Sequence, residues 1–177
     1  MVSSFLNCII FGIITIYKID FVVGISNLKM ENLIYIKVNN RIKSIKIDWK
    51  YKTLSKMLKS IQKKIEGKNI QKIYGLSFGG YLVSLLETKA KKIILSPTPL
   101  YKGFVEKMPE KEKKYMGKRR YEEAKNTPIP IIKADVFVGE NEPELAKKVA
   151  KALGKAKIVK GYGHSQKLFN KLIYGKL

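Results

Sequence analysis

A serine stands between glycines in the stretch GLSFGG, residues 75–80. Apolar residues precede this serine, Ser77, and a helix-like stripe follows it, so we predict a turn from a strand into a helix. Flanking glycines relieve the crowding of such a turn and leave the hydroxyl exposed above the sheet. The N–H of Phe78 would point toward a developing oxyanion, with the positive end of the helix dipole behind it. The pattern favours Ser77 as a nucleophile over an ordinary glycine-rich turn.

A serine hydroxyl is a weak nucleophile until a base removes its proton, so Ser77 predicts a histidine. The chain has one, His164, within GYGHS at residues 161–165. It follows the last predicted strand and precedes the closing helix, which is the position that the serine requires. A surface or capping role is the alternative for a lone histidine. We predict His164 as the general base.

A carboxylate should orient the imidazole and stabilise its cation. The strand predicted at 131–139 is followed by ENEPE at residues 140–144. Glu142 is the preferred acid and Glu140 the alternative. Glutamates here could instead stabilise the start of the next helix through its dipole, an interpretation that is strongest for Glu144.

The elements that must position these residues alternate between short β-branched runs and helix-like stretches. This alternation predicts an α/β fold with a mostly parallel central sheet and helices on both faces. Strands are predicted at 6–12, 32–38, 71–76, 92–96, 131–139 and 157–159. Helices are predicted at 18–30, 52–66, 78–88, 144–153 and 166–174.

The stretch 33–47 allows two interpretations. It alternates between apolar and polar residues on either side of Asn39-Asn40, which favours a hairpin. It could instead form one parallel strand and a loop, which we favour because a doubly wound sheet requires a strand, a helix and a second strand before the helix at 52–66. If this stretch is a hairpin, translation could begin at Met30, shortly before its first strand.

The segment 99–127 is charged and is predicted to be a helical insertion over one end of the sheet, within a single domain that spans residues 1–177. Its methionines and tyrosines could form an apolar inner face. Its lysines and arginines could meet an anionic substrate or form a solvated outer face with neighbouring glutamates, and we favour the solvated face.

Composition limits the other classes of function. The net charge of +22 attracts anionic partners without specificity, and no motif for specific nucleic-acid recognition is present. One cysteine, Cys8, excludes a disulfide within the chain, and one cysteine with one histidine makes a zinc site unexpected. No metal or other cofactor is predicted.

The apolar run Phe5 to Tyr17 is short for a membrane span, so we expect a cytoplasmic protein, with an N-terminal anchor or signal as the less favoured alternative.

The order of the motifs GLSFGG, KIILSPTPL, VFVGENEPE and GYGHS resembles the α/β-hydrolase superfamily, from about Lys52 to the C-terminus. The resemblance implies a three-layer sandwich of a small, esterase-like serine hydrolase. It implies Ser77 as the nucleophile, Glu142 as the acid and His164 as the base, with the Phe78 amide in the oxyanion hole.

Two further features follow from the same resemblance. Members usually carry a His-Gly or Gly-Gly pair after the first core strand, and this chain has Gly12-Ile13-Ile14 there, which makes Ile13 the candidate second oxyanion donor. The segment 99–127 occupies the place of a lid, which sets substrate choice in such enzymes.

The predicted activity is hydrolysis of a carboxylic ester or related acyl bond in a small molecule, through an acyl-Ser77 intermediate. The alternative is a catalytically weak or inactive protein of the same fold that binds nucleic acid or an acidic protein through its basic surface, because fold does not fix function.

Overall fold

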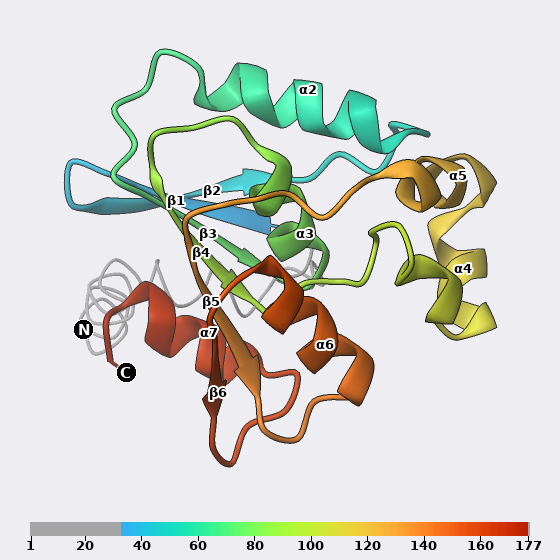
Figure 1. Ribbon diagram of the computed structural model, residues 1–177. Helices are drawn as coiled ribbons and strands as arrows, with labels where there is room; N and C mark the ends of the chain where they lie inside the picture. Colours follow the sequence, from blue (N-terminus) through green and yellow to red (C-terminus); the bar gives the residue numbers. More distant parts are fainter. Residues whose placement is uncertain (1–32, 177) are drawn as a thin grey trace, which may run out of the picture. The chain divides into compact units, whose positions relative to one another are not determined.

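The computed structural model describes residues 33–176, and its centre is a six-stranded sheet (Figure 1). The strand predicted at 6–12, the helix predicted at 18–30 and the candidate donor Ile13 lie outside the described residues. The strands are β1 (Leu33–Val38), β2 (Arg41–Lys46), β3 (Lys72–Leu76), β4 (Lys91–Leu95), β5 (Ala134–Gly139) and β6 (Ala156–Val159). Their order across the sheet is β2-β1-β3-β4-β5-β6.

Four neighbouring strands, β3 to β6, run parallel, whereas β1 runs antiparallel to both β2 and β3. Their crossover connections contain helices, as parallel pairs require. The prediction of an α/β fold with a mostly parallel sheet is therefore confirmed.

The stretch 33–47 is a hairpin, so our preference for one parallel strand and a loop was wrong. Val38 pairs with Arg41 across a two-residue turn. The turn residues Asn39 and Asn40 have φ values of 48° and 59°. A two-residue hairpin turn of type I′, which matches the twist of the strands, needs positive φ at both positions, and asparagine tolerates this better than most residues.

Six α-helices lie within the described residues, together with a short 3-10 turn at Val105–Lys107. They are α2 (Leu54–Ile65), α3 (Phe78–Leu85), α4 (Glu110–Met116), α5 (Lys118–Asn126), α6 (Glu144–Leu153) and α7 (Gln166–Ile173). The predicted helices at 52–66, 78–88, 144–153 and 166–174 correspond to α2, α3, α6 and α7, and α4 and α5 occupy the segment 99–127. None of these six is long and apolar enough to cross a membrane.

Helices pack on both faces of the sheet (Figure 1). One core cluster joins alternate strand residues such as Ile34, Ile73 and Ile94 to the apolar faces of α2, α3 and α6. The intervening strand residues face the other way, where the Tyr35 ring meets Phe169 of α7 edge-on, with ring centres 5.8 Å apart. This alternation follows from the two-residue repeat of a strand, and it buries both faces of the sheet.

Candidate active site

The parallel strands bring residues that are far apart in sequence to one edge of the sheet. Because β3, β4, β5 and β6 are consecutive neighbours, the chain leaves all four at the same edge. Ser77 follows β3, Ser96 follows β4, Glu142 follows β5 and His164 follows β6. Open α/β sheets bind ligands at this carboxyl edge.

Ser77 has a backbone conformation that L-residues rarely adopt, with φ of 54° and ψ of −117°. Such a residue costs about 1–3 kcal/mol and persists only where the surroundings hold it. Three hydrogen bonds hold it here. The Ser77 N–H donates to the Leu95 carbonyl at 3.0 Å, and the Ser77 carbonyl accepts from the N–H groups of Tyr81 at 3.0 Å and Thr98 at 3.1 Å. The predicted tight turn from strand to helix is therefore present.

The glycines around this turn allow a close approach of α3 to β3. A Cβ atom at Gly75 would lie 2.4 Å from the carbonyl oxygen of Gly79 and 2.6 Å from the nitrogen of Gly80. A Cβ at Gly80 would lie 3.1 Å from the carbonyl oxygen of Gly75. Since Phe78 is the first residue of α3, its amide has no acceptor within the helix, as an oxyanion donor requires.

The Ser77 hydroxyl is paired with Thr98, a residue of the stretch KIILSPTPL to which the sequence assigned no role. Ser77 Oγ lies 3.2 Å from Thr98 Oγ1, in a half-buried position after β4. Together with the backbone bond between the same residues, this contact fixes the loop after β4 against the turn at Ser77. A threonine three residues beyond a strand is too common to predict such a role.

Glu142 and His164 form the predicted acid–imidazole contact. His164 Nδ1 lies 3.1 Å from Glu142 Oε1. The Glu142 side chain is 2% exposed and that of His164 is 40% exposed. A buried carboxylate that holds Nδ1 of a more exposed imidazole fixes the tautomer and the orientation of the ring.

The Glu142 carboxyl stays ionised at neutral pH. Burial raises its pKa, but the contact with His164 and the nearby Ser96 hydroxyl, together with the charges of His164 and Lys147, bring the pKa below its ordinary value. An ionised carboxylate is the state that stabilises an imidazolium.

Glu140, the alternative acid, has a different partner. Its Oε2 accepts a hydrogen bond of 2.9 Å from the N–H of Gly161. Glu140 therefore braces the turn that leads to His164, whereas Glu142 contacts the imidazole itself.

Gly139, at the end of β5, permits a close contact that the sequence reasoning missed. A Cβ there would lie 2.4 Å from the carbonyl oxygen of Tyr162 and 2.8 Å from that of Gly163. The N–H of Asn141 also donates to the Tyr162 carbonyl at 2.8 Å. The end of β5 is thus packed directly against the loop that carries His164. A glycine that ends a predicted strand was the only available signal.

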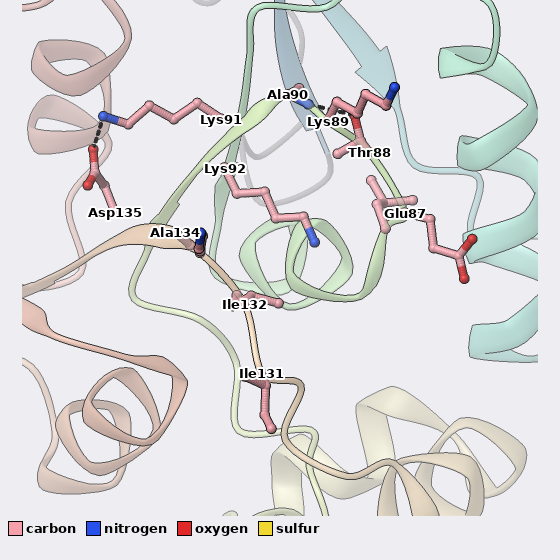
Figure 2. A pocket seen from close by; sticks show the side chains of 12 residues that line it. Glu87, Thr88, Lys89, Ala90, Lys91, Lys92, Ile131, Ile132, Ala134 and Asp135 are labelled. Carbon is pink, nitrogen blue, oxygen red and sulfur yellow. Dashed lines mark hydrogen bonds and ion pairs between the residues drawn. The ribbon is translucent and has the colours of Figure 1, made fainter.

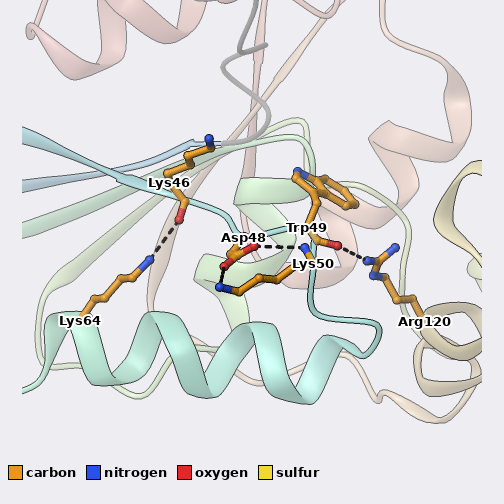
Figure 3. Close-up of polar contacts among 6 residues, drawn as sticks. All are labelled: Lys46, Asp48, Trp49, Lys50, Lys64 and Arg120. Carbon is orange, nitrogen blue, oxygen red and sulfur yellow. Dashed lines mark hydrogen bonds and ion pairs between the residues drawn. The ribbon is translucent and has the colours of Figure 1, made fainter.

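An aromatic stack borders the turn at Ser77. The Trp49 ring lies on the Phe78 ring, with centres 4.7 Å apart and planes 28° apart. The guanidinium of Arg120 lies 5.2 Å from the centre of the Trp49 ring. Arg120 also donates to the carbonyls of Trp49 at 2.9 Å and Tyr51 at 2.7 Å, and Figure 3 shows it reaching toward Trp49. The segment 99–127 is therefore attached to the loop before α2.

A depression of about 720 Å³ in the described part of the chain lies away from Ser77. Its lining includes Lys91 and Lys92 at the start of β4 and Ala134 and Asp135 at the start of β5 (Figure 2). It therefore opens at the amino edge of the sheet, and we do not assign it to the active site. No group of three or more His, Cys, Asp or Glu side chains within residues 33–176 is placed to hold a metal ion.

Comparisons with known proteins identify no relative: no family model, curated protein or solved structure matches the chain. The candidate site therefore rests on its own geometry and on the order of its motifs.

Proposed function

We propose that this protein is a serine hydrolase of the α/β-hydrolase type, which cleaves a carboxylic ester or a related acyl bond through an acyl-Ser77 intermediate. One observation carries the proposal. The strained serine at a strand-to-helix turn shares the carboxyl edge of the sheet with a hydrogen-bonded pair, the buried Glu142 and the more exposed His164.

In this mechanism His164 takes the proton of the Ser77 hydroxyl as Oγ attacks the substrate carbonyl. Because Glu142 holds Nδ1, proton exchange falls to Nε2. Ser77 Oγ first turns from its contact with Thr98 toward the imidazole. The Phe78 amide then stabilises the oxyanion of the tetrahedral intermediate.

Acyl transfer follows the usual two steps. Collapse of the tetrahedral intermediate breaks the bond to the leaving group, which takes the proton from the His164 imidazolium and departs, and the acyl group stays on Ser77 Oγ. Water then attacks this ester, again deprotonated by His164, and the carboxylic acid product leaves with Ser77 restored. Glu142 stabilises the imidazolium in both steps without accepting its proton.

The segment 99–127 is the proposed lid. Its α5 supplies Arg120, which lies on the Trp49 ring, and Trp49 in turn stacks on Phe78, the residue next to the nucleophile. The stack gives the proposed lid an aromatic contact next to the nucleophile, which supports an acyl group as the part of the substrate bound there.

Labelling with a fluorophosphonate tests the proposal, because this reagent reacts with activated serines. We expect the native protein to be labelled, Ser77→Ala to be unlabelled, and His164→Ala to be labelled at least 100-fold more slowly, since general base catalysis contributes about 10²–10⁴. Hydrolysis of p-nitrophenyl acetate should fall in parallel.

Glu140→Gln is the matched control, because it changes a neighbouring glutamate that does not contact the imidazole. It should be labelled at nearly the native rate. Labelling that survives Ser77→Ala would remove the nucleophile assignment. Absence of both labelling and esterase activity, with salt-sensitive binding to random DNA, would favour the alternative of a basic binding protein.

A further inference from the structure

Ser96, directly after β4, combines two costly features that the proposed mechanism does not use. Its φ of 46° lies in the left-handed region, where glycine and asparagine are the usual occupants. Of the four positive-φ residues other than glycine in the described part of the chain, two are the hairpin asparagines and the third is Ser77. Strained residues cluster at functional sites, so Ser96 needs an explanation of its own.

The hydroxyl of Ser96 is buried and unsatisfied. The residue is 2% exposed. Within residues 33–176, its Oγ is one of three buried side-chain polar atoms that have no hydrogen-bond partner. A buried donor without an acceptor is unfavourable, whereas an alanine or a glycine at this position would avoid the penalty.

The position of Ser96 puts it beside the carboxylate of the candidate site. Its N–H donates to the carbonyl of Phe137 in β5 at 2.9 Å, which fixes Ser96 against the strand that leads to Glu142. Glu142 is also buried, and among residues 33–176 the side-chain hydrogen bond of its carboxylate is the one to His164 Nδ1, which leaves acceptor capacity on this carboxylate. A buried carboxylate can accept several hydrogen bonds, and a serine hydrogen can rotate toward an acceptor.

We propose that Ser96 is a positioning residue for the Glu142–His164 pair, whose hydroxyl donates to the Glu142 carboxylate and holds it in place beside the imidazole. The inference rests on the proposed function. The contribution of Ser96 to the low pKa of Glu142 supports it, and the other groups that lower this pKa are His164 and Lys147 of α6. The strained backbone at Ser96 is then the feature that directs the hydroxyl toward the acid.

The first test measures the pKa of Glu142 by carbon NMR of the full-length protein, with its carboxyl signal identified by its loss in Glu142→Gln. Ser96→Ala removes the hydroxyl and keeps the strained backbone, whereas Ser96→Gly removes both. We expect the Glu142 pKa to rise in both variants, since each removes a donor to the charged form. An unchanged pKa in the two variants would overturn the proposal and would leave a buried water as the partner of Ser96.

The control is Ser84→Ala, which also removes a buried serine hydroxyl. Ser84 Oγ donates to the Tyr81 carbonyl at 2.6 Å and is paired with Tyr101 Oη at 2.8 Å, at a place away from Glu142. This variant should leave the Glu142 pKa unchanged. A rise as large as in the Ser96 variants would show a general effect of destabilisation and would contradict the proposal.

The second test measures the rate at which a fluorophosphonate labels Ser77. We expect it to fall about tenfold in both Ser96 variants, as expected when one hydrogen bond to a charged group is lost. A rise in the Glu142 pKa with unchanged labelling would reject the positioning role. A rise in this pKa in a protein that is never labelled would instead reject the proposed hydrolase function while the contact of Ser96 with Glu142 stands.

Discussion

Two glutamates two positions apart, Glu140 and Glu142, have separate tasks at the candidate site. Glu142 contacts the imidazole of His164, and Glu140 holds the backbone of Gly161. The sequence left the choice between them open, because their spacing from Gly139 differs by only two residues. The path of the chain after β5 decides which of them faces the histidine.

The titration of His164 should separate the two glutamates. The chain has a single histidine, so its imidazole signal in proton NMR needs no assignment. A neighbouring carboxylate favours the imidazolium, so Glu142→Gln should lower the pKa of His164. The same variant should slow labelling of Ser77 by roughly two to four orders of magnitude. Glu140→Gln should change neither quantity appreciably, and equal effects of both variants would contradict the assignment of Glu142.

The depressed pKa of Glu142 also predicts a pH dependence of stability. A carboxyl whose pKa is lower in the folded protein stabilises it above the ordinary pKa of glutamate, about 4.3, and loses this contribution as the pH falls through the folded value. Glutamine does not titrate. The difference in unfolding free energy between the native protein and Glu142→Gln should therefore shrink between pH 6 and pH 3, as measured by urea denaturation. A difference that stays constant across this range would refute the prediction.

At the scale of the elements, the contact between the end of β5 and the His164 loop depends on Gly139. Alanine at this position would place a Cβ atom 2.4 Å from the Tyr162 carbonyl oxygen, so the loop must move. We expect Gly139→Ala to lower the unfolding free energy by about 1–3 kcal/mol, a typical cost of overpacking. Because the loop carries His164, labelling of Ser77 should slow as well.

Gly163→Ala is the matched control, since it changes a glycine directly beside His164. A Cβ there would find its nearest neighbour, Asn141 Cβ, at 3.7 Å, which is an ordinary contact. Its unfolding free energy should stay within about 0.5 kcal/mol of the native value. If both alanine variants were equally stable, the close approach at Gly139 would not be a constraint.

The sequence predicted helices and strands correctly where local signals decide them. It failed where contacts with distant parts of the chain decide the arrangement. The amphipathic spacing at 52–66 predicted α2, and GLSFGG predicted the strained turn at Ser77. The direction of β1 was wrong, because an apolar strand pairs equally well in either direction until its turn and its neighbour are known. Asn39-Asn40 carried the correct signal, and our preference for a doubly wound order overrode it.

The same division holds within the candidate site. Ser77 and His164 were identified because each sits in a glycine-rich motif at the end of a predicted strand. Ser96 and Thr98 were not identified, because the strand order that sets them between Ser77 and Glu142 is a property of the whole sheet. The acid could be limited to one short segment, and the structure was needed to show which oxygen meets the imidazole.

At the scale of the whole molecule, two side chains of α5 attach the segment 99–127 to the rest of the fold. Glu123 accepts hydrogen bonds from the N–H groups of Leu54 and Ser55 and from the Ser55 hydroxyl, at the N-terminus of α2. A carboxylate is favoured there by the helix dipole and by the unpaired N–H groups of the first turn. Arg120 binds the loop that precedes α2. The two contacts join the proposed lid to the helix and the loop beside the aromatic stack on Phe78.

Removal of Arg120 should loosen the segment 99–127 from the loop before α2. The guanidinium donates to three backbone carbonyls, those of Met116, Trp49 and Tyr51, and burial lowers its pKa without making it titrate near neutral pH. Arg120→Ala leaves these carbonyls without their charged donor, so we expect the unfolding free energy to fall by about 1–3 kcal/mol. Trypsin should cleave within 99–127 several-fold faster, and the fluorescence of Trp49, the only tryptophan in the chain, should change.

Arg119→Ala, which alters the exposed neighbour, should match the native protein in all three measurements. Equal behaviour of the two variants would mean that Arg120 does not hold the proposed lid.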